Sequence, residues 1–520
     1  MGKKIKLNKP IQTRRAGVLL HISSLPAGSF GTGDFGVSAY QFVDFLSEIG
    51  ASIWQTLPLN MPHDDGSPYQ CLSAHAGRLE FISLESLVAQ NLLNKNDLLP
   101  DTDSLQAQGL FSQNIPAEAG YSCVKAKRYE LFNKVYINYK QQKNVNLQKQ
   151  FRSFCRQNSN WLNDFALFLV LRKKFNKTGW HTWPKAYKNK QPALMAKVKL
   201  RYLHEIAVIK FTQFLFFSQW QALKAYANKK GVAMFGDIPI FVAYDSADVW
   251  AHPRLFKLDS SKNMQVVAGV PPDYFSASGQ RWGNPHYNWS EMQCDGFKWW
   301  LERIRTQQRM FDLLRIDHFR GLQAAWEIPA TEETAINGSW VLAPGAELLD
   351  AITARFPDMQ LIAEDLGTIT DEVNALREQF NLPSMKILQF AFGGGDDNPY
   401  LPHNIETNSV AYTGTHDNDT TLGWYQQLDE RTKDHVNTIL GVAEPEMPQA
   451  LIELVMASNA NIAIIPMQDI LGLDKAHRMN TPGTTDKNWQ WRYDWAQLTQ
   501  ADIASIKQVI RQHQRANKWH

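Results

Sequence analysis

Cysteine is scarce in this chain, which excludes scaffolds built on disulfides or zinc. The four cysteines lie far apart along 520 residues, with neither the spacing of zinc ligands nor that of a disulfide-rich domain. Unpaired thiols are typical of a reducing compartment, so we expect a cytoplasmic protein. The histidines show no metal-binding spacing either, and we expect neither a metal nor a cofactor.

Long apolar runs and a strong net charge are also lacking. No run of 18 apolar residues occurs, so we expect no membrane-spanning segment. The net charge is only +3, and basic residues alternate with acidic ones, which argues against a nucleic-acid partner. Residues 1–15 are the exception, with six basic residues and no acid. The apolar stretch that follows, 16–20, is too short for a secretory signal, so we interpret 1–15 as a solvated basic tail.

Eight short apolar runs, each ending in polar, Gly or Pro residues, are typical of buried parallel strands. They span residues 17–21, 52–57, 232–238, 313–317, 360–364, 385–390, 410–414 and 462–467. Amphipathic stretches of helical length, such as 38–49 and 370–380, lie between several of them. Eight alternating strands and helices predict an α/β fold, a (β/α)8 TIM barrel, with chemistry at the C-terminal strand ends.

The spacing of these runs predicts how the chain is divided. About 170 residues separate the second and third runs, far more than one crossover helix needs. Apolar residues from Leu203 to Leu223 recur every three or four positions, so we expect a largely helical inserted subdomain at 61–230. The barrel then comprises 16–60 and 231–492 with loop insertions. A helical segment, 493–520, packs on it and is too short for a C-terminal β-sandwich.

Three of the predicted strand ends carry carboxylates. Arg315 and Asp317 are two residues apart, so on a strand both point to one face, and the guanidinium would keep the carboxylate ionised. A structural ion pair is the alternative interpretation of any isolated Arg-x-Asp. Glu364 and Asp365 must point to opposite sides, and the alternation directs Glu364 inward and leaves Asp365 as a cap or loop brace. Asp417 follows a third run.

Histidines follow or precede two of these carboxylates, at His318 and His416, and the conjunction of three such strand ends makes chance placement a weak explanation. Two carboxylates about 5 Å apart support double displacement at a glycosidic bond, in which one attacks and the other transfers protons. The pattern therefore indicates a carboxylate-based catalytic site, and double displacement at a glycosidic bond is a chemistry that it fits, although the sequence alone does not give the separation of the carboxylates.

At this point a resemblance becomes specific. The segments 315–321, 363–367 and 414–418 resemble the three catalytic-strand motifs of the amylomaltases, or 4-α-glucanotransferases, of the α-amylase clan. Further segments resemble amylomaltase signatures at 67–69, 236–239, 271–275, 279–285 and 478–483. Together they extend over nearly the whole chain. One departure is Gly77-Arg78-Leu79, where the family more often has Gly-Asn-Pro, and it affects the expected shape of that loop.

The resemblance implies roles for individual residues. It implies that Asp317 is the nucleophile, Glu364 the general acid/base, and Asp417 the carboxylate that holds sugar hydroxyls and stabilises the transition state. Aromatic side chains in Gly- and Pro-containing loops suit sugar stacking. The substrate-binding residues that it implies are Ser67, Tyr69, Asp237, Tyr274, Phe275, Gln280, Trp282, Arg315, His318, His416 and Asn488.

The expected activity is transfer of a 1,4-α-glucan segment from a maltooligosaccharide donor to the 4-hydroxyl of glucose or another glucan. Transfer requires loops that exclude water from the covalent intermediate, and residues 271–284 and 478–488 are the candidates. Two alternatives remain open, an α-amylase-like retaining hydrolase and an inactive glucan-binding protein. The intact trio of carboxylates argues against the latter.

Overall fold

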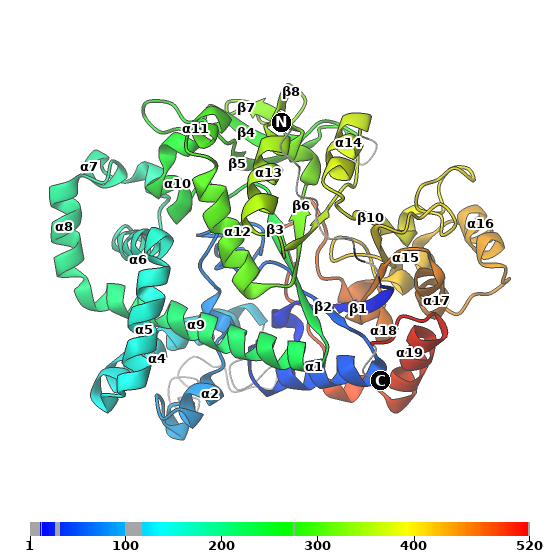
Figure 1. Ribbon diagram of the computed structural model, residues 1–520, viewed down its shortest axis with the longest axis horizontal. Helices are drawn as coiled ribbons and strands as arrows, with labels where there is room; N and C mark the ends of the chain where they lie inside the picture. Colours follow the sequence, from blue (N-terminus) through cyan, green and yellow to red (C-terminus); the bar gives the residue numbers. More distant parts are fainter. Residues whose placement is uncertain (1–10, 12, 27–31, 99–116, 274–275, 518–520) are drawn as a thin grey trace.

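The centre of the molecule is a sheet of eight parallel strands (Figure 1). The computed structural model describes residues 11, 13–26, 32–98, 117–273 and 276–517. The strands follow the spatial order β10-β11-β12-β1-β2-β3-β6-β9, which is their chain order around a closed ring. Their bounds are β1 Arg15–Leu19, β2 Ile53–Gln55, β3 Ala233–Pro239, β6 Leu313–Asp317, β9 Gln360–Ala363, β10 Ser384–Ile387, β11 Ser409–Tyr412 and β12 Ile462–Pro466.

The ring closes between β9 and β10. The backbone N–H of Ala363 donates to the carbonyl of Pro383 at 3.0 Å, immediately before β10 begins. Each of the eight apolar runs overlaps one of these strands, so the predicted (β/α)8 barrel is confirmed. The sixth run, 385–390, extends past its strand because residues 388–390 form a 3-10 turn.

Alternate residues of the strands fill the barrel interior. Leu313, Ile362 and Ile464 belong to one buried interior cluster, whereas their neighbours pack outward against the helices. Gly17 of β1 also faces inward, where a Cβ atom would lie 2.5 Å from Ile464 Cδ1. Only glycine fits at this position, and the barrel is a packed core rather than a pore.

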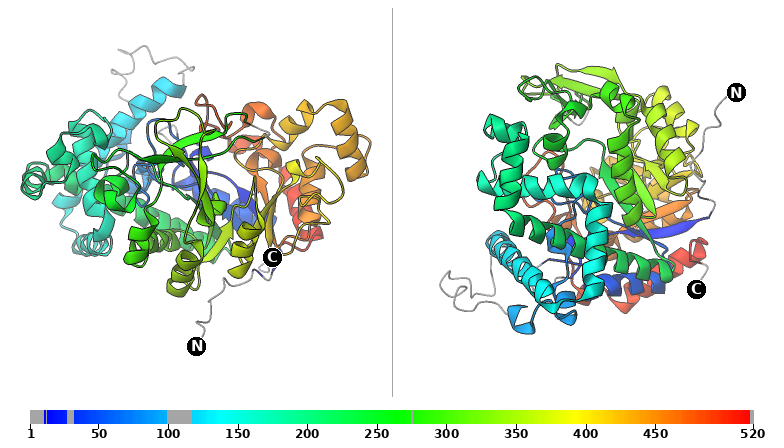
Figure 2. Two further views of the ribbon diagram at one scale, coloured as in Figure 1. Left: turned by 90° about the horizontal axis from the view of Figure 1, so that it is seen from above. Right: turned by 60° about the vertical axis from the view of Figure 1, so that its left-hand side comes forward.

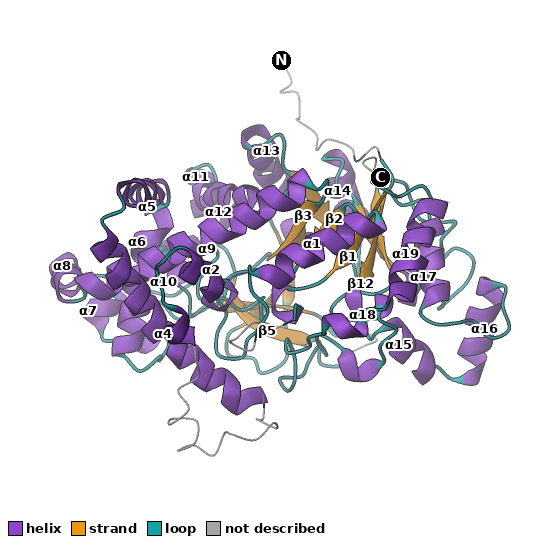
Figure 3. Cartoon of the chain, turned by 90° about the horizontal axis from the view of Figure 1, so that it is seen from below, coloured by secondary structure: helices purple, strands orange, loops and turns teal. Residues whose placement is uncertain are grey.

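Helices surround the barrel (Figure 3). Helices α1 (Val37–Ile49) and α14 (Asp371–Gln379) correspond to the predicted amphipathic stretches. The barrel segments also contain α10 (Ala247–Ala251), α11 (Trp289–Cys294), α12 (Lys298–Met310), α13 (Gly345–Arg355), α15 (Thr421–Gln427), α16 (Glu430–Leu440), α17 (Gln449–Ala457) and α18 (Met467–Ile470), and α19 (Gln500–Gln512) follows them. Within residues 467–517 no strand occurs.

A group of helices lies to one side of the barrel, between β2 and β3 in the chain (Figures 1 and 2). It comprises α2 (Leu84–Ala89), α4 (Ala117–Gln142), α5 (Val145–Gln157), α6 (Ser159–Lys174), α7 (Lys185–Lys188), α8 (Pro192–Arg201) and α9 (Leu203–Lys229). The apolar stripe that starts at Leu203 forms α9, and Trp220 on it donates to the carbonyl of Met310 at 2.9 Å. In the described part of the chain, no helix is long and apolar enough to cross a membrane.

A second, antiparallel sheet was not predicted. Its order is β5-β4-β7-β8, with β4 Val266–Val270, β5 Gln280–Pro285, β7 Ala324–Pro329 and β8 Ser339–Leu342. The expectation of mostly helical insertions missed it because its strands are short and contain Gly269, Gly283 and Pro285, which weaken a strand pattern. This sheet approaches the barrel mouth, where Trp282 of β5 packs edge-on against His318, with ring centroids 4.8 Å apart.

Candidate active site

Arg315 and Asp317 point to the same side of β6, into the barrel mouth. Arg315 Nη2 lies 2.8 Å from Asp317 Oδ1, and Arg315 Nη1 lies 2.6 Å from Asp237 Oδ2 on the neighbouring strand β3. The Arg315 and Asp237 side chains are only 6% and 1% exposed. A shared, buried guanidinium thus fixes both carboxylates and favours the ionised form of Asp317.

Glu364 follows β9 directly and lies beside the end of β6. Its Oε2 accepts the backbone N–H of His318 at 2.6 Å, and its Oε1 accepts that of Leu366 at 3.0 Å. Since His318 is the residue after Asp317, the two carboxylates occupy adjacent strand ends. His318 has φ 55°, a left-handed conformation uncommon for a residue with a side chain, and this conformation belongs to the turn that begins there.

Asp365 points to the other side of the chain from Glu364. Its carboxylate accepts the backbone N–H of Met385 at 2.7 Å and lies 3.4 Å from Arg377. Asp365 therefore ties β9 to β10 and to α14 instead of facing the barrel mouth.

Asp417 lies on the loop after β11. Asn418 Oδ1 accepts both the backbone N–H and the hydroxyl of Thr415, which folds this loop into a tight turn. Asn480 Nδ2 donates to Asp417 Oδ1 at 2.6 Å, and His416 Nε2 lies 3.5 Å from Asp417 Oδ2. The side chain of Asp417 is 47% exposed, against 29% for Asp317.

Tyr69 links the loop after β2 to two of these strands. Its hydroxyl donates to Asp237 Oδ2 at 2.8 Å and lies 2.9 Å from His416 Nε2. The ring of Trp489 packs near both Tyr69 and His416, with centroids 5.9 and 6.0 Å away. Tyr69, Asp237, Arg315, His318 and His416 therefore line one region with the three carboxylates.

Burial sets the electrostatics of this region. Burial raises the pKa of Asp317 above its usual range, Arg315 opposes that rise, and Asp237 and Glu364 add to it. Burial also raises the pKa of Glu364, although Arg315 and the two backbone donors favour its ionised form. The pKa of His318 is lowered by burial to about 3, and that of His416 is lowered for the same reason. Both imidazoles are neutral hydrogen-bonding groups at neutral pH.

The other predicted substrate-binding residues lie in loops. Trp282 Nε1 donates to Gln280 Oε1 at 3.1 Å. Ser67 Oγ accepts the backbone N–H of Tyr69 at 3.3 Å. Asn488 accepts from the Thr481 backbone N–H and donates to the Thr484 carbonyl, so its contacts shape the 478–488 loop. Tyr274 and Phe275 lie outside the described residues.

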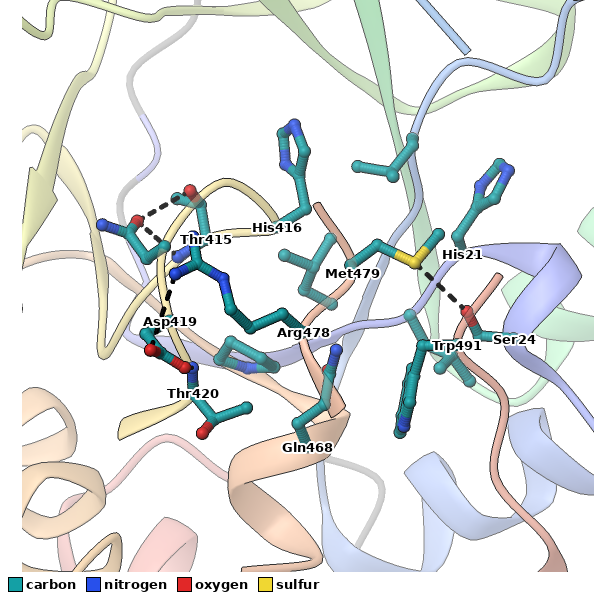
Figure 4. Close-up of a pocket in the computed structure, with 15 residues that line it drawn as sticks. His21, Ser24, Thr415, His416, Asp419, Thr420, Gln468, Arg478, Met479 and Trp491 are labelled. Carbon is teal, nitrogen blue, oxygen red and sulfur yellow. Dashed lines mark hydrogen bonds and ion pairs between the residues drawn. The ribbon is translucent and has the colours of Figure 1, made fainter. Parts of the chain in front are cut away.

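Two contributors to the site were missed in the sequence. Asn480 and Trp489 belong to the loop that follows Arg478, and neither was among the residues expected to contact substrate or carboxylates. Asn480 could have been found from its place in the 478–483 motif. For Trp489 the only indication in the sequence was that its side chain is aromatic. Figure 4 shows the neighbouring pocket, in which Arg478 reaches toward Asp419 and Thr415 while Met479 turns toward Ser24.

The arrangement provides what acid/base chemistry at a glycosidic bond requires. Burial raises the pKa of both carboxyls, that of Asp317 to about 8, so the two differ in their partners rather than in the direction of the shift. Asp317 is held by the Arg315 guanidinium, whereas Glu364 accepts two backbone N–H groups, and a raised pKa suits proton donation near neutral pH. Across the part of the chain that the structure describes, no three His, Cys, Asp or Glu side chains gather as a metal site would require.

Comparisons with known proteins agree on one family. Residues 20–499 match a family model described as 4-alpha-glucanotransferase. The chain is 43% identical over 492 residues to the 4-alpha-glucanotransferase of Synechocystis sp., covering 94% of this chain and 95% of the relative. It is 42% identical to the chloroplastic/amyloplastic 4-alpha-glucanotransferase of Solanum tuberosum, covering 93% and 83%. The structure of Streptococcus agalactiae amylomaltase in complex with acarbose superposes with a TM-score of 0.90 at 35% identity, covering 97% of this chain and 100% of that one.

Proposed function

Because the chain belongs to the 4-alpha-glucanotransferase family, we propose that it cleaves an α-1,4-glucan and transfers the non-reducing segment to the 4-hydroxyl of glucose or another glucan. The observation that carries the proposal is the pairing of Asp317 and Glu364 at adjacent strand ends. Glu364 is hydrogen-bonded to the backbone of the residue that follows Asp317. Acarbose in the Streptococcus agalactiae relative supports a saccharide substrate.

In the first half of the reaction, Asp317 is the nucleophile. One of its carboxylate oxygens attacks the anomeric carbon while the bond from that carbon to the leaving oxygen breaks. Arg315 favours the ionised form of this carboxylate and orients it, since it binds Asp317 Oδ1 at 2.8 Å. Glu364 gives its proton to the leaving oxygen, so that the departing glucan leaves as an alcohol.

In the second half, the 4-hydroxyl of the acceptor attacks the glucosyl carbon bound to Asp317. Glu364, now a carboxylate, takes the hydroxyl proton, and Asp317 leaves as a carboxylate. Two displacements retain the α configuration. Asp417 accepts hydrogen bonds from hydroxyls of the reacting sugar, which strengthen as positive charge develops at the anomeric carbon.

The sugar beside Asp317 is bound by side chains from several strand ends. Tyr69, His318 and His416 offer neutral donors, acceptors and ring faces around the carboxylates. Gln280 and Trp282 approach from β5, and Trp282 covers His318. We assign acceptor binding and water exclusion to loop 271–284, because a dry, occupied acceptor site favours transfer over hydrolysis.

Incubation with maltotriose tests the proposal. Transfer releases glucose and produces a ladder of longer maltooligosaccharides without a net rise in reducing ends. A rise in reducing ends without longer products would instead establish an α-amylase-like hydrolase, and binding without turnover an inactive glucan-binding protein. The Asp317→Asn variant, nearly isosteric, is the control for contaminating activity and for the nucleophile.

The compartment proposed is the cytoplasm. The described cysteines Cys71, Cys155 and Cys294 are free thiols, which suits a reducing environment. Fractionation of cells that express the tagged protein tests this assignment.

A further inference from the structure

We propose that Asn480 is a positioning residue that sets the orientation of the Asp417 carboxylate. It belongs to a strap, defined as residues 478–480, that contacts the loop after β11. The inference rests on the proposed function of Asp417 and assigns to Asn480 a part in that function.

Asp417 differs from the other two carboxylates in what holds it. Asp317 is bound by the guanidinium of Arg315, and Glu364 by two backbone N–H groups. The carboxylate of Asp417 is more exposed and receives a 2.6 Å hydrogen bond from the Asn480 amide. A half-exposed side chain on a loop loses its fixed rotamer when its partner is removed, so Asn480 has more control over this carboxylate than any single donor has over Glu364.

The strap itself is firmly fixed. Met479 is 4% exposed and inserts among the side chains of the barrel interior, and its sulfur lies 3.7 Å from Ser24 Oγ. Its carbonyl accepts the backbone N–H of Trp489 at 2.8 Å. Arg478 and Asn480 instead reach Asp417 on the loop after β11. Figure 4 shows Met479 and Arg478 diverging in this way.

Arg478 holds the backbone of the same loop while Asn480 holds the carboxylate. Arg478 Nη2 donates to the Asp417 carbonyl at 3.0 Å, and Nη1 lies 3.5 Å from Asp419 Oδ2. The strap therefore grips Asp417 at two points, one on the backbone and one on the side chain. Because Asn480 occupies Oδ1, Oδ2 remains for sugar hydroxyls, and it lies 3.5 Å from His416 Nε2.

Replacing the Asn480 side chain should therefore lower turnover without unfolding the protein. For Asn480→Leu, which keeps the volume and loses the donor, we expect kcat on maltotriose to fall about 10- to 100-fold with little change in KM. In the double variant with Asp417→Asn, the loss should be no greater than in Asp417→Asn alone, because Asn480 acts only through the carboxylate that Asp417→Asn already removes. Asn263→Leu is the matched control, since Asn263 makes a similar bond to Asp259 at an exposed turn.

Asn480→Asp provides a second readout that does not depend on an apolar substitution. Two carboxyls in contact share a proton, so the acid limb of the pH profile of kcat should move to higher pH. The charged and titratable groups that face this position are His416 on the same loop, Arg478 on the strap and Asp317 across the mouth.

Wild-type kcat in Asn480→Leu, additive losses in the double variant, or an unmoved acid limb in Asn480→Asp would each overturn the inference. The Asp417→Asn variant separates this failure from that of the proposed function. If Asp417→Asn is inactive and Asn480→Leu is fully active, only the strap inference fails. If Asp417→Asn turns over like the wild type, the proposed role of Asp417 is wrong and the inference falls with it.

Discussion

Arg315 and Asp317 lie 2.8 Å apart, guanidinium nitrogen to carboxylate oxygen, on the inward side of β6. Two residues of one strand that are separated by a single position share a face, so this contact follows from strand geometry alone. The same guanidinium binds Asp237, which is buried on β3. One cation thus offsets the repulsion between two carboxylates at the barrel mouth.

Replacing Arg315 with Met should raise the pH at which activity appears. Arg315 lowers the pKa of Asp317 against the effect of burial, so its loss leaves that pKa higher and the nucleophile protonated over a wider range. We expect kcat/KM to fall about 10²- to 10³-fold near neutral pH and the acid limb of its pH profile to shift to higher pH. Arg315→Lys, which retains a charge, should shift the limb less. A limb that does not move in either variant would refute the electrostatic role.

For Glu364→Gln, the expected defect depends on the leaving group. Glutamine cannot donate a proton, so transfer from maltotriose should fall about 10²- to 10⁴-fold. A glucoside with an activated leaving group such as a nitrophenolate needs no proton, and its cleavage should be partly restored. Rates of both substrates, measured in wild type and variant, provide the comparison. Equal losses on the two substrates would contradict an acid role.

The barrel and its inward-facing carboxylates could be predicted because their signals are local. A strand buried on both faces reads as a continuous apolar run, and alternation then decides which side of the strand Glu364 and Asp365 take. The contacts observed for Glu364 with His318 and for Asp365 with Met385 lie on opposite sides of the chain.

The contacts between loops could not be predicted, because they depend on how the barrel closes. Asn480 and Asp417 are 63 residues apart and meet only because β11 and β12 are neighbours in the ring. Tyr69 and Asp237 are 168 residues apart and meet across the helical insertion. Strands β4 and β7 pair over 57 to 63 residues, from Gly269↔Trp326 to Val266↔Pro329. The periodicity of apolar residues within one segment does not show which distant loops will be in contact.

Stability should fall as the pH drops below about 6.5, and His75 is one cause. Burial lowers its pKa to about 4, so the folded state keeps it neutral while the unfolded chain takes up a proton below its ordinary pKa. The unfolded state therefore binds more protons between pH 6.5 and 4, and the free energy of unfolding decreases by on the order of 3 kcal/mol across that window. Urea unfolding at several pH values should show a shallower decline for His75→Asn. The exposed His435→Asn should leave the slope unchanged.

Asp365→Ala should separate stability from catalysis at the residue next to Glu364. The substitution removes the acceptor for the Met385 backbone N–H and one of the carboxylates around Arg377, while Glu378 and Glu406 still pair with that guanidinium. We expect the free energy of unfolding to fall by about 2–3 kcal/mol, because a buried donor is left without its partner. The kcat of the protein that remains folded should change little, since Asp365 faces away from the barrel mouth. Urea unfolding gives the stability and maltotriose turnover gives kcat, both measured on the same preparations.

Glu364→Gln is the matched comparison, with the reverse expectation of a large loss in kcat and a small change in stability. A loss of kcat in Asp365→Ala as large as that in Glu364→Gln, at conditions where both are folded, would place Asp365 in the catalytic machinery instead.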